Sequence, residues 1–306
     1  MTNVHNTIQD TVWQDNTRPR IVGIKAQLEH RAETLTPMEN FSLAKCDLHG
    51  INLVNKHSRT GYKLTNCDLY HANLENAHLF KIDLSGSSLM KANLAKANLN
   101  YANLDGCNLL GINLKGAKIE HVNWGKQITQ EKQAQKAKST ENKFDLYQQA
   151  EEIYRHLRQI AEHQGLFELA GHFFQKEMIM RRKQLPKWSF KRIISRLVDI
   201  FCGYGERPLR VIIFSVSLIT FFATLYFFSG LSFSGESLAF NPSLTLWENI
   251  KVFFGALYFS VVTFTTLGYG DVAPIGIARA LAAFEAFLGS FTLALFVVVF
   301  VKKMTR

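Results

Sequence analysis

The feature that most restricts how this chain can fold is a five-residue period between residues 41 and 124. Leucine or another large apolar residue occupies every fifth position, first in a short block and then in a long one: Leu43, Leu48, Leu53, Leu64, Leu69, Leu74, Leu79, Leu84, Leu89, Leu94, Leu99, Leu104, Leu109, Leu114, Ile119 and Trp124. A period of five matches neither the helical period of 3.6 nor the strand period of 2, so neither element would bury these positions on one side. A coil in which four pentapeptides make one square turn would bury all of them.

The repeated Ala-Asn-Leu runs of this stretch closely resemble the pentapeptide-repeat family. The resemblance implies a right-handed quadrilateral β-helix over residues 41–124. Some members of that family resemble DNA and bind enzymes that handle DNA, which requires an acidic surface. Here nine Lys and Arg residues stand against six Asp and Glu residues. We therefore interpret the coil as a rigid docking or sensing surface for a regulator that the sequence does not identify.

The two blocks of the repeat are separated by eleven residues, from Leu53 to Leu64, which is two repeats plus one residue. This spacing predicts a loop over residues 57–61 that occupies one side of the square. Counting through it predicts one interior column, with neighbours about 4.8 Å apart, made of Cys46, Cys67, Ser87 and Cys107. We interpret the column as small interior residues rather than a redox or metal site, because buried free cysteine behaves as a small hydrophobe.

Three segments surround the repeat. Residues 1–40 are polar and aperiodic, which predicts a flexible or loosely docked lead-in, and residues 125–141 read as a polar linker. Residues 142–186 carry apolar side chains at three- and four-residue steps, with a stop at Gly165, which predicts a helical hairpin. This hairpin resembles one unit of a tetratricopeptide-type repeat. Three histidines in it are expected to be surface or hydrogen-bonded core residues rather than metal ligands: His156, His163 and His172.

The C-terminal part is strongly apolar. The mean hydropathy of -0.02 averages the charged residues 1–208 with two apolar runs, residues 209–230 and 275–301. Each run is long enough to cross the ~30 Å of membrane hydrocarbon, which takes ~20 helical residues. Basic residues flank the two runs and acidic residues predominate between them, so positive-inside bias places both termini in the cytosol. With no cleavable signal peptide visible, we expect a multi-pass protein of the cell (inner) membrane.

A shorter apolar stretch, residues 249–265, lies between the two runs and ends directly at Thr265-Thr266-Leu267-Gly268-Tyr269-Gly270-Asp271. It predicts a re-entrant helix, since irregular backbone at membrane depth is tolerated only where it lines a watery cavity or is buried in protein. Gly268 and Gly270 permit positive φ at alternate residues. The segment resembles the filter of the potassium channels, whose T-V-G-Y-G loops replace the water shell of the ion with carbonyl oxygens from four subunits.

This resemblance implies a homotetramer with a potassium site at the carbonyls of Thr266, Leu267, Gly268 and Tyr269, followed by Gly270. Leu267 replaces the valine of the motif, and its effect on packing behind the filter stays open. Tyr269 would point outward and pack the filter against its pore helix. The residues expected to support the filter are Thr265, Asp271, its hydrogen-bond partner Tyr258, and Glu285. For Glu285, an ionisable residue within a membrane helix, we favour this structural role over ion binding.

The inner helix would carry the gate. By its distance from the filter, Gly289 matches the hinge glycine of the family. The pore-lining candidates are Leu293, Val297 and Val301, with Phe296 and Phe300 as alternatives for the constriction. Because few residues follow Val301, we expect gating forces to reach the inner helix from the N-terminal side.

Residues 187–203 form an amphipathic pattern with Phe190, Ile194 and Leu197 on one face and charged residues opposite. We expect a helix in the membrane interface. It resembles the slide helix that precedes the outer helix of several potassium channels; the alternative is an ordinary helix packed on the hairpin. The net charge of +10 lies largely beside the apolar runs, which favours anionic lipid over nucleic acid as partner. The basic side chains expected to face lipid are Lys187, Arg192, Arg196, Arg207, Arg210 and Lys302.

These features together predict a multi-domain membrane protein: a pentapeptide-repeat β-helix, an α-helical hairpin connector and an all-α tetrameric pore. The predicted function is potassium-selective conduction, regulated by a cytosolic N-terminal domain, with no cofactor besides the permeant ion. The alternatives are a non-selective cation channel and a membrane-anchored scaffold with a silent pore. An enzyme is not expected, since the sequence holds no nucleophile, metal or phosphate-loop constellation. The gating stimulus and the resting state stay open.

Overall fold

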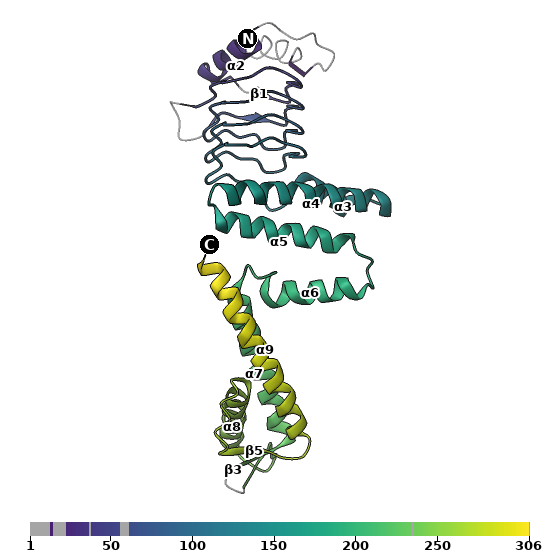
Figure 1. Ribbon diagram of the computed structural model, residues 1–306, viewed down its shortest axis with the longest axis vertical. Coiled ribbons are helices and arrows are strands. Elements are labelled where there is room, and N and C mark those ends of the chain that lie inside the picture. The colour runs from purple at the N-terminus through teal and green to yellow at the C-terminus, as the bar shows by residue number, and fades with distance from the viewer. Residues whose placement is uncertain (1–12, 15–22, 37, 56–60, 234–235, 306) are drawn as a thin grey trace. The chain divides into compact units, whose positions relative to one another are not determined.

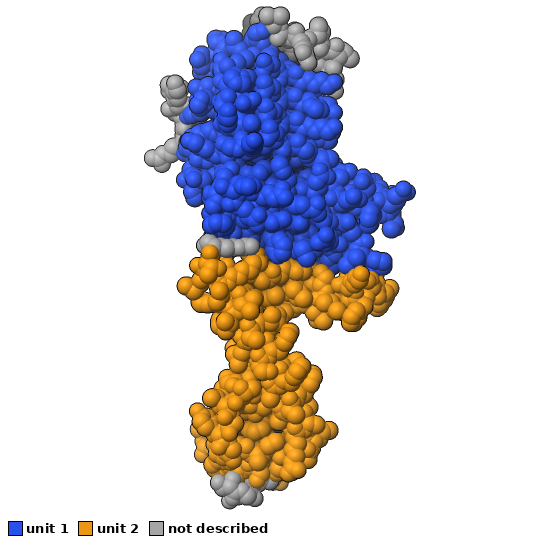
Figure 2. Space-filling view, viewed as in Figure 1, with its two compact units in different colours: residues 1–186 blue, residues 187–306 orange. Residues whose placement is uncertain are grey.

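The computed structural model describes residues 13–14, 23–36, 38–55, 61–233 and 236–305 (Figure 1). It forms two compact units, residues 1–186 and 187–306, which Figure 2 distinguishes by colour. Each unit has its own apolar core.

The five-residue period produces a coil with four pentapeptides per turn. Parallel bridges join residues twenty positions apart, for example Asn73 to Asn93 and Asn93 to Asn113. The leucine and alanine positions of the repeat are buried, except for Cys46 and Val122, which are half-buried. On the outer surface of the coil, side-chain amides of successive turns also form hydrogen bonds; for example, Asn113 Nδ2 donates to Asn93 Oδ1 at 2.8 Å. The period therefore buries one apolar column per side of the turn and leaves a ladder of amides on its surface.

The register across the break between the two blocks differs from the prediction. Ser42 pairs with Asp68 and Asp47 pairs with Asn73, so this turn contains 26 residues instead of 20. The insertion adds six residues, and the loop does not occupy a side of the square. Of the predicted loop, residues 57–60 lie outside the described residues. The prediction was wrong because a spacing of eleven residues has two explanations. It fits two sides of five residues plus one extra residue, and it fits one side of five residues plus six extra residues.

The interior column changes accordingly. Asp47 pairs with Asn73, so Cys46 belongs to the side of Ala72, and the column contains Cys67, Ser87 and Cys107. The backbone N–H of Cys67 donates to Ser87 Oγ at 3.0 Å. Burial raises the pKa of the Cys67 thiol to about 11 and that of Cys107 to about 12. Both thiols are therefore protonated at neutral pH, as expected for small interior residues.

The N-terminal end of the coil is covered by α2 (Ile24–Glu33), in which Leu28 and Ala32 are buried. Lys25 Nζ donates to the His49 carbonyl at 2.8 Å, and the Asn52 N–H donates to Glu29 Oε1 at 2.9 Å. These bonds satisfy backbone groups that have no preceding turn to pair with. Within the lead-in predicted for residues 1–40, residues 24–33 therefore form a packed capping helix, and residues 1–12 and 15–22 lie outside the described residues.

The other end of the coil is covered by α3 (Thr129–Lys136) and α4 (Thr140–His163). A further turn would pair with the carbonyls of Cys107, Ile112 and Ala117, and here side chains replace it. Thr129 Oγ1 donates to Cys107 at 3.0 Å, His156 Nε2 to Ile112 at 2.9 Å and Gln164 Nε2 to Ala117 at 2.7 Å. The predicted polar linker is wrong over residues 129–136, because its polar side chains cap the coil.

The hairpin pairs α4 with α5 (Phe167–Gln184), which lie side by side (Figure 1). The buried Glu177 joins them by accepting from Arg155 Nε at 3.2 Å and from Arg158 Nε at 2.9 Å. Because Glu177 has two cationic partners, its burial leaves no uncompensated charge.

The C-terminal unit contains α6 (Phe190–Cys202), α7 (Pro208–Ser229), α8 (Leu246–Phe264) and α9 (Ala278–Met304). Among the described residues, α7 and α9 are long and apolar enough to cross a membrane. An antiparallel sheet in the order β4-β3-β5, absent from the sequence prediction, joins the segment after α7 to the segment after the glycine motif. Its strands are β3 (Leu231–Phe233), β4 (Glu236–Leu238) and β5 (Val272–Pro274).

Candidate functional site

The site is built at the C-terminal end of α8. This helix begins with a capping box, in which Glu248 N–H donates to Thr245 Oγ1 at 3.4 Å and Thr245 N–H donates to Glu248 Oε2 at 2.9 Å. It ends at Phe264, and the N–H of Thr266 still donates to the Thr263 carbonyl at 3.0 Å. The partial negative charge of the helix C-terminus therefore lies where the glycine motif starts, which favours a cation there.

The motif has an alternating backbone. Thr266, Gly268 and Gly270 have φ values of 58°, 60° and 79°. A Cβ at either glycine would meet nothing within 4 Å in this chain. Glycine is therefore favoured at these two positions by conformation rather than by space, since left-handed φ costs other residues about 1–2 kcal/mol. The sequence predicted the two glycine positions and missed Thr266, which extends the alternation by one step.

Two side chains of the motif face outward. Leu267 is 59% exposed and Tyr269 is 67% exposed. Tyr269 therefore points outward, as predicted, and its packing against the pore helix stays a prediction.

A hydrogen bond ties the end of the motif to α8. Tyr258 OH donates to Asp271 Oδ2 at 2.9 Å, which is the contact predicted from the sequence. Thr265, the other predicted supporting residue, donates from Oγ1 to the Val261 carbonyl at 2.7 Å. These two bonds hold both ends of the motif to the same helix.

Behind the motif, a buried carboxylate joins α7, α8 and α9. Glu285 is fully buried, and it accepts from Tyr226 OH at 2.7 Å and from Ser260 Oγ at 2.5 Å. The Ser260 hydroxyl also lies 2.9 Å from the Ile219 carbonyl oxygen of α7. Glu285 is thus in contact with structural partners from both other helices, and the partners Tyr226 and Ser260 were not predicted.

Gly289 lies where α9 crosses α8. A Cβ at Gly289 would lie 2.0 Å from the Phe264 carbonyl oxygen. The absence of a side chain therefore allows a close approach of two helices. The hinge inferred from the sequence stays a prediction.

The remaining gating candidates on α9 divide into two groups. Phe296 packs against the small cluster of Cys202, Val211 and Val299. The others are exposed to between 39% and 58% in this chain: Leu293, Val297, Phe300 and Val301.

Two of the basic residues predicted to face lipid have partners within the chain. Lys302 Nζ donates to Glu206 Oε1 at 2.6 Å, and Arg210 Nη1 donates to the Asp199 main-chain carbonyl at 2.7 Å and lies 3.5 Å from Asp199 Oδ1. These contacts join the end of α9 and the start of α7 to the α6–α7 elbow, which we define as residues 199–206. The other basic residues lie on or beside α6 and α7, and of these Lys187, Arg196 and Arg207 are exposed whereas Arg192 is half-buried.

The fold and this site define a membrane ion channel that carries an N-terminal repeat domain. A family model described as an ion channel matches residues 213–306, and the model of pentapeptide repeats matches residues 67–100 and 92–123. The C-terminal residues 213–306 are therefore similar to ion channels, and residues 67–123 are similar to pentapeptide-repeat proteins.

Among curated proteins, Protein LctB of Geobacillus stearothermophilus is 41% identical over 49 residues, which are 16% of this chain and 37% of LctB. The chain thus spans well under half the length of this relative. Similar solved structures include HetL, a pentapeptide repeat protein of Nostoc, at 33% identity, 27% coverage of this chain, 38% coverage of HetL and a TM-score of 0.16. Another is Rfr23, a pentapeptide repeat protein of Cyanothece, at 24% identity, 34% coverage of this chain, 97% coverage of Rfr23 and a TM-score of 0.13.

Proposed function

We propose that this protein is a homotetrameric channel that conducts dehydrated potassium ions along the carbonyls of residues 266–269. The observation that carries the proposal is the left-handed φ at Thr266, Gly268 and Gly270, directly after the C-terminus of α8. Alternating left-handed residues turn successive carbonyls toward one side of the segment. Such a row of oxygens can replace the water shell of a monovalent cation.

One chain supplies one row of oxygens, and a closed ring around an ion requires four. The exposed Tyr269 and the exposed apolar face of α9 support further copies of the chain as their cover. The mass of the detergent-purified particle tests this assembly. A monomer or a dimer as the largest species would contradict it.

Potassium selectivity is tested by flux into liposomes and by reversal potentials in mixed sodium and potassium. Gly268→Val should strongly reduce potassium flux, because it adds a second β-branched residue at positive φ to a motif that already holds Thr266 there. The matched control is Gly255→Ala in α8, where a Cβ meets its nearest neighbour, Leu238, at an ordinary 3.8 Å. Equal permeability of sodium would favour a non-selective cation channel, and absence of flux in wild-type protein would favour a scaffold with a silent pore.

We also propose that the N-terminal coil is a right-handed quadrilateral β-helix in the cytosol and that both termini face it. Positive-inside bias supports this orientation in the inner membrane. Neither matched family model describes an enzyme, and we retain the assignment as a non-enzymatic protein that needs only its permeant ion.

Regulation is proposed to reach the pore through α6 and the α6–α7 elbow. The supporting contacts are the Glu206–Lys302 pair and the packing of Phe296 beside Cys202. A chain truncated to residues 187–306 should conduct with an altered open probability, because it lacks the repeat and the hairpin. Unchanged gating in bilayer recordings would remove this proposal.

Anionic lipid is proposed to act on α6 and the basic residues beside it. α6 presents Phe190 and Leu197 at 73% and 60% exposure, which suits burial in the interface. The exposed Lys187, Arg196 and Arg207 supply positive charge beside it. Open probability should differ between zwitterionic vesicles and vesicles with anionic lipid, and the difference should shrink when Arg196 is replaced by Gln.

A further inference from the structure

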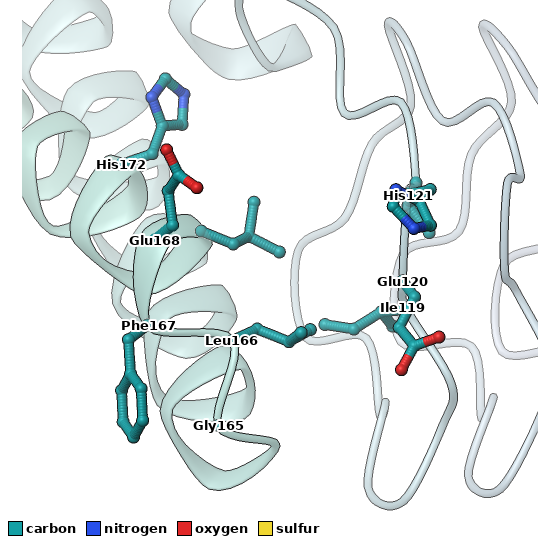
Figure 3. A pocket seen from close by; sticks show the side chains of 10 residues that line it. Ile119, Glu120, His121, Gly165, Leu166, Phe167, Glu168 and His172 are labelled. Carbon is teal, nitrogen blue, oxygen red and sulfur yellow. The ribbon is translucent and has the colours of Figure 1, made fainter. Parts of the chain in front are cut away.

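A pocket of about 810 Å³ lies within the N-terminal unit, between the last turn of the coil and the start of α5 (Figure 3). Residues 119–122 line one side, and residues 165–169 together with His172 line the other. Its volume falls in the range of small-molecule sites, about 300–1,000 Å³. Nothing in the proposed conduction path uses it.

The interior of the pocket is apolar. Leu166 and Ile119 extend toward each other from the two sides (Figure 3), and Leu169 and Val122 also line it. Ile119 has no exposed surface, so the half-buried Leu166, Leu169 and Val122 supply the apolar surface that a ligand can reach. The pocket therefore suits a ligand with an apolar body.

Hydrogen-bond acceptors surround this apolar interior. The carboxylates of Glu120 and Glu168 belong to opposite sides of the pocket (Figure 3). None of the lining residues is Lys or Arg. The N-terminus of α5 would by itself favour an anion, but Glu168 already occupies its first turn.

The register of the coil supplies a third acceptor. One turn earlier, the Ala102 carbonyl accepts from the Asn123 N–H at 2.9 Å, so the equivalent Val122 carbonyl is directed toward the missing next turn. The equivalent carbonyls on the other three sides receive donors from Thr129, His156 and Gln164. Within the part of the chain that the structure describes, no hydrogen bond reaches the Val122 carbonyl.

An aromatic surface adjoins these acceptors. His121, which lines the pocket, stacks on Tyr101 with ring centroids 4.7 Å apart, and Tyr101 contacts Phe80 at 5.7 Å. Tyr101 is 51% exposed. Aromatic faces attract cations as well as flat apolar groups.

We propose that this pocket binds a small organic cation, a protonated amine or guanidinium carried on an apolar body. The positive group donates to acceptors among Glu120, Glu168 and the Val122 carbonyl, because an ammonium or guanidinium carries several donors and no acceptor. The apolar body lies against the half-buried Leu166, Leu169 and Val122.

Calorimetric titration of the full chain in a non-ionic detergent tests the site with three probes: phenethylammonium, butylammonium and agmatine. At least one probe should bind saturably at one site per chain. 2-Phenylethanol, which has the body of phenethylammonium without its charge, should bind roughly tenfold more weakly or worse. The readout involves no ion flux, so its outcome is independent of the proposed conduction.

The double variant E120Q E168Q should weaken probe binding roughly tenfold or more, since it removes both charges and keeps the side-chain shapes. Both residues are exposed, so the variant should fold normally. The matched control is E39Q E141Q, which removes two exposed carboxylates outside the pocket. Three outcomes would each overturn the proposal: no saturable binding of any probe, equal binding of the alcohol, or unchanged binding by E120Q E168Q.

Discussion

Reversing the charge of Lys302 should change the gating equilibrium, because this side chain joins the end of α9 to the α6–α7 elbow. Its Nζ lies 2.6 Å from Glu206 Oε1, with side-chain exposures of 34% for the lysine and 7% for the glutamate. Lys302→Glu would leave a nearly buried carboxylate facing a second one.

The magnitude follows from this burial. Exposed ion pairs contribute about 0.2–1 kcal/mol, and breaking a fully buried pair costs about 3–5 kcal/mol. Since Glu206 is buried and Lys302 is one-third exposed, we expect a coupling of about 1–3 kcal/mol. That energy corresponds to a change of about 5- to 150-fold in an equilibrium constant.

Single-channel recordings of four proteins measure the coupling: wild type, K302E, E206K and the exchanged pair E206K K302E. Each single variant should shift the open-to-closed ratio in the same direction, and the exchanged pair should return it toward wild type. A double-mutant cycle in which the two effects add within about 0.5 kcal/mol would refute the reasoning, since independent sites behave that way.

Three further predictions follow from single contacts. Glu285→Gln should preserve the thermal stability of the detergent-solubilised particle, because the amide can still accept and donate hydrogen bonds. Glu285→Ala should lower that stability, because it leaves a buried hydroxyl unpaired at a cost of about 1–3 kcal/mol. Equal melting temperatures of the two variants would contradict this. Gly289→Ala should destabilise the particle by about 1–3 kcal/mol through overpacking, whereas the control Gly255→Ala should not. A Gly289→Ala particle with wild-type stability and altered gating would instead support a hinge at this position. In thiol titrations, Cys67 and Cys107 should stay unreactive at pH 9, because their pKa values of about 11 and 12 keep them protonated. An ordinary thiol, with a pKa of about 8.5, is mostly ionised at this pH. Rapid labelling of Cys67 or Cys107 in the folded protein would show that the column is open to solvent.

The spacing of residues along the chain was sufficient to predict the repetitive parts of this protein. A period of five buries leucine in a coil such as the one around Leu94, whatever its neighbours do. Two long apolar runs predict membrane helices, and Gly268 and Gly270 predict positive φ at alternate positions. These features follow from local geometry, in which each residue acts with neighbours a few positions away.

Tertiary structure decided which distant groups meet. The turn of 26 residues, and with it the place of Cys46, depends on how two coil turns pair, and the spacing alone allows two answers. The polar residues 129–136 form a capping helix because the last turn has carbonyls to satisfy, and Lys302 has Glu206 as its partner because α9 ends beside the elbow. Pairings of this kind bring together groups that are far apart in the chain, so no periodicity of the sequence predicts them.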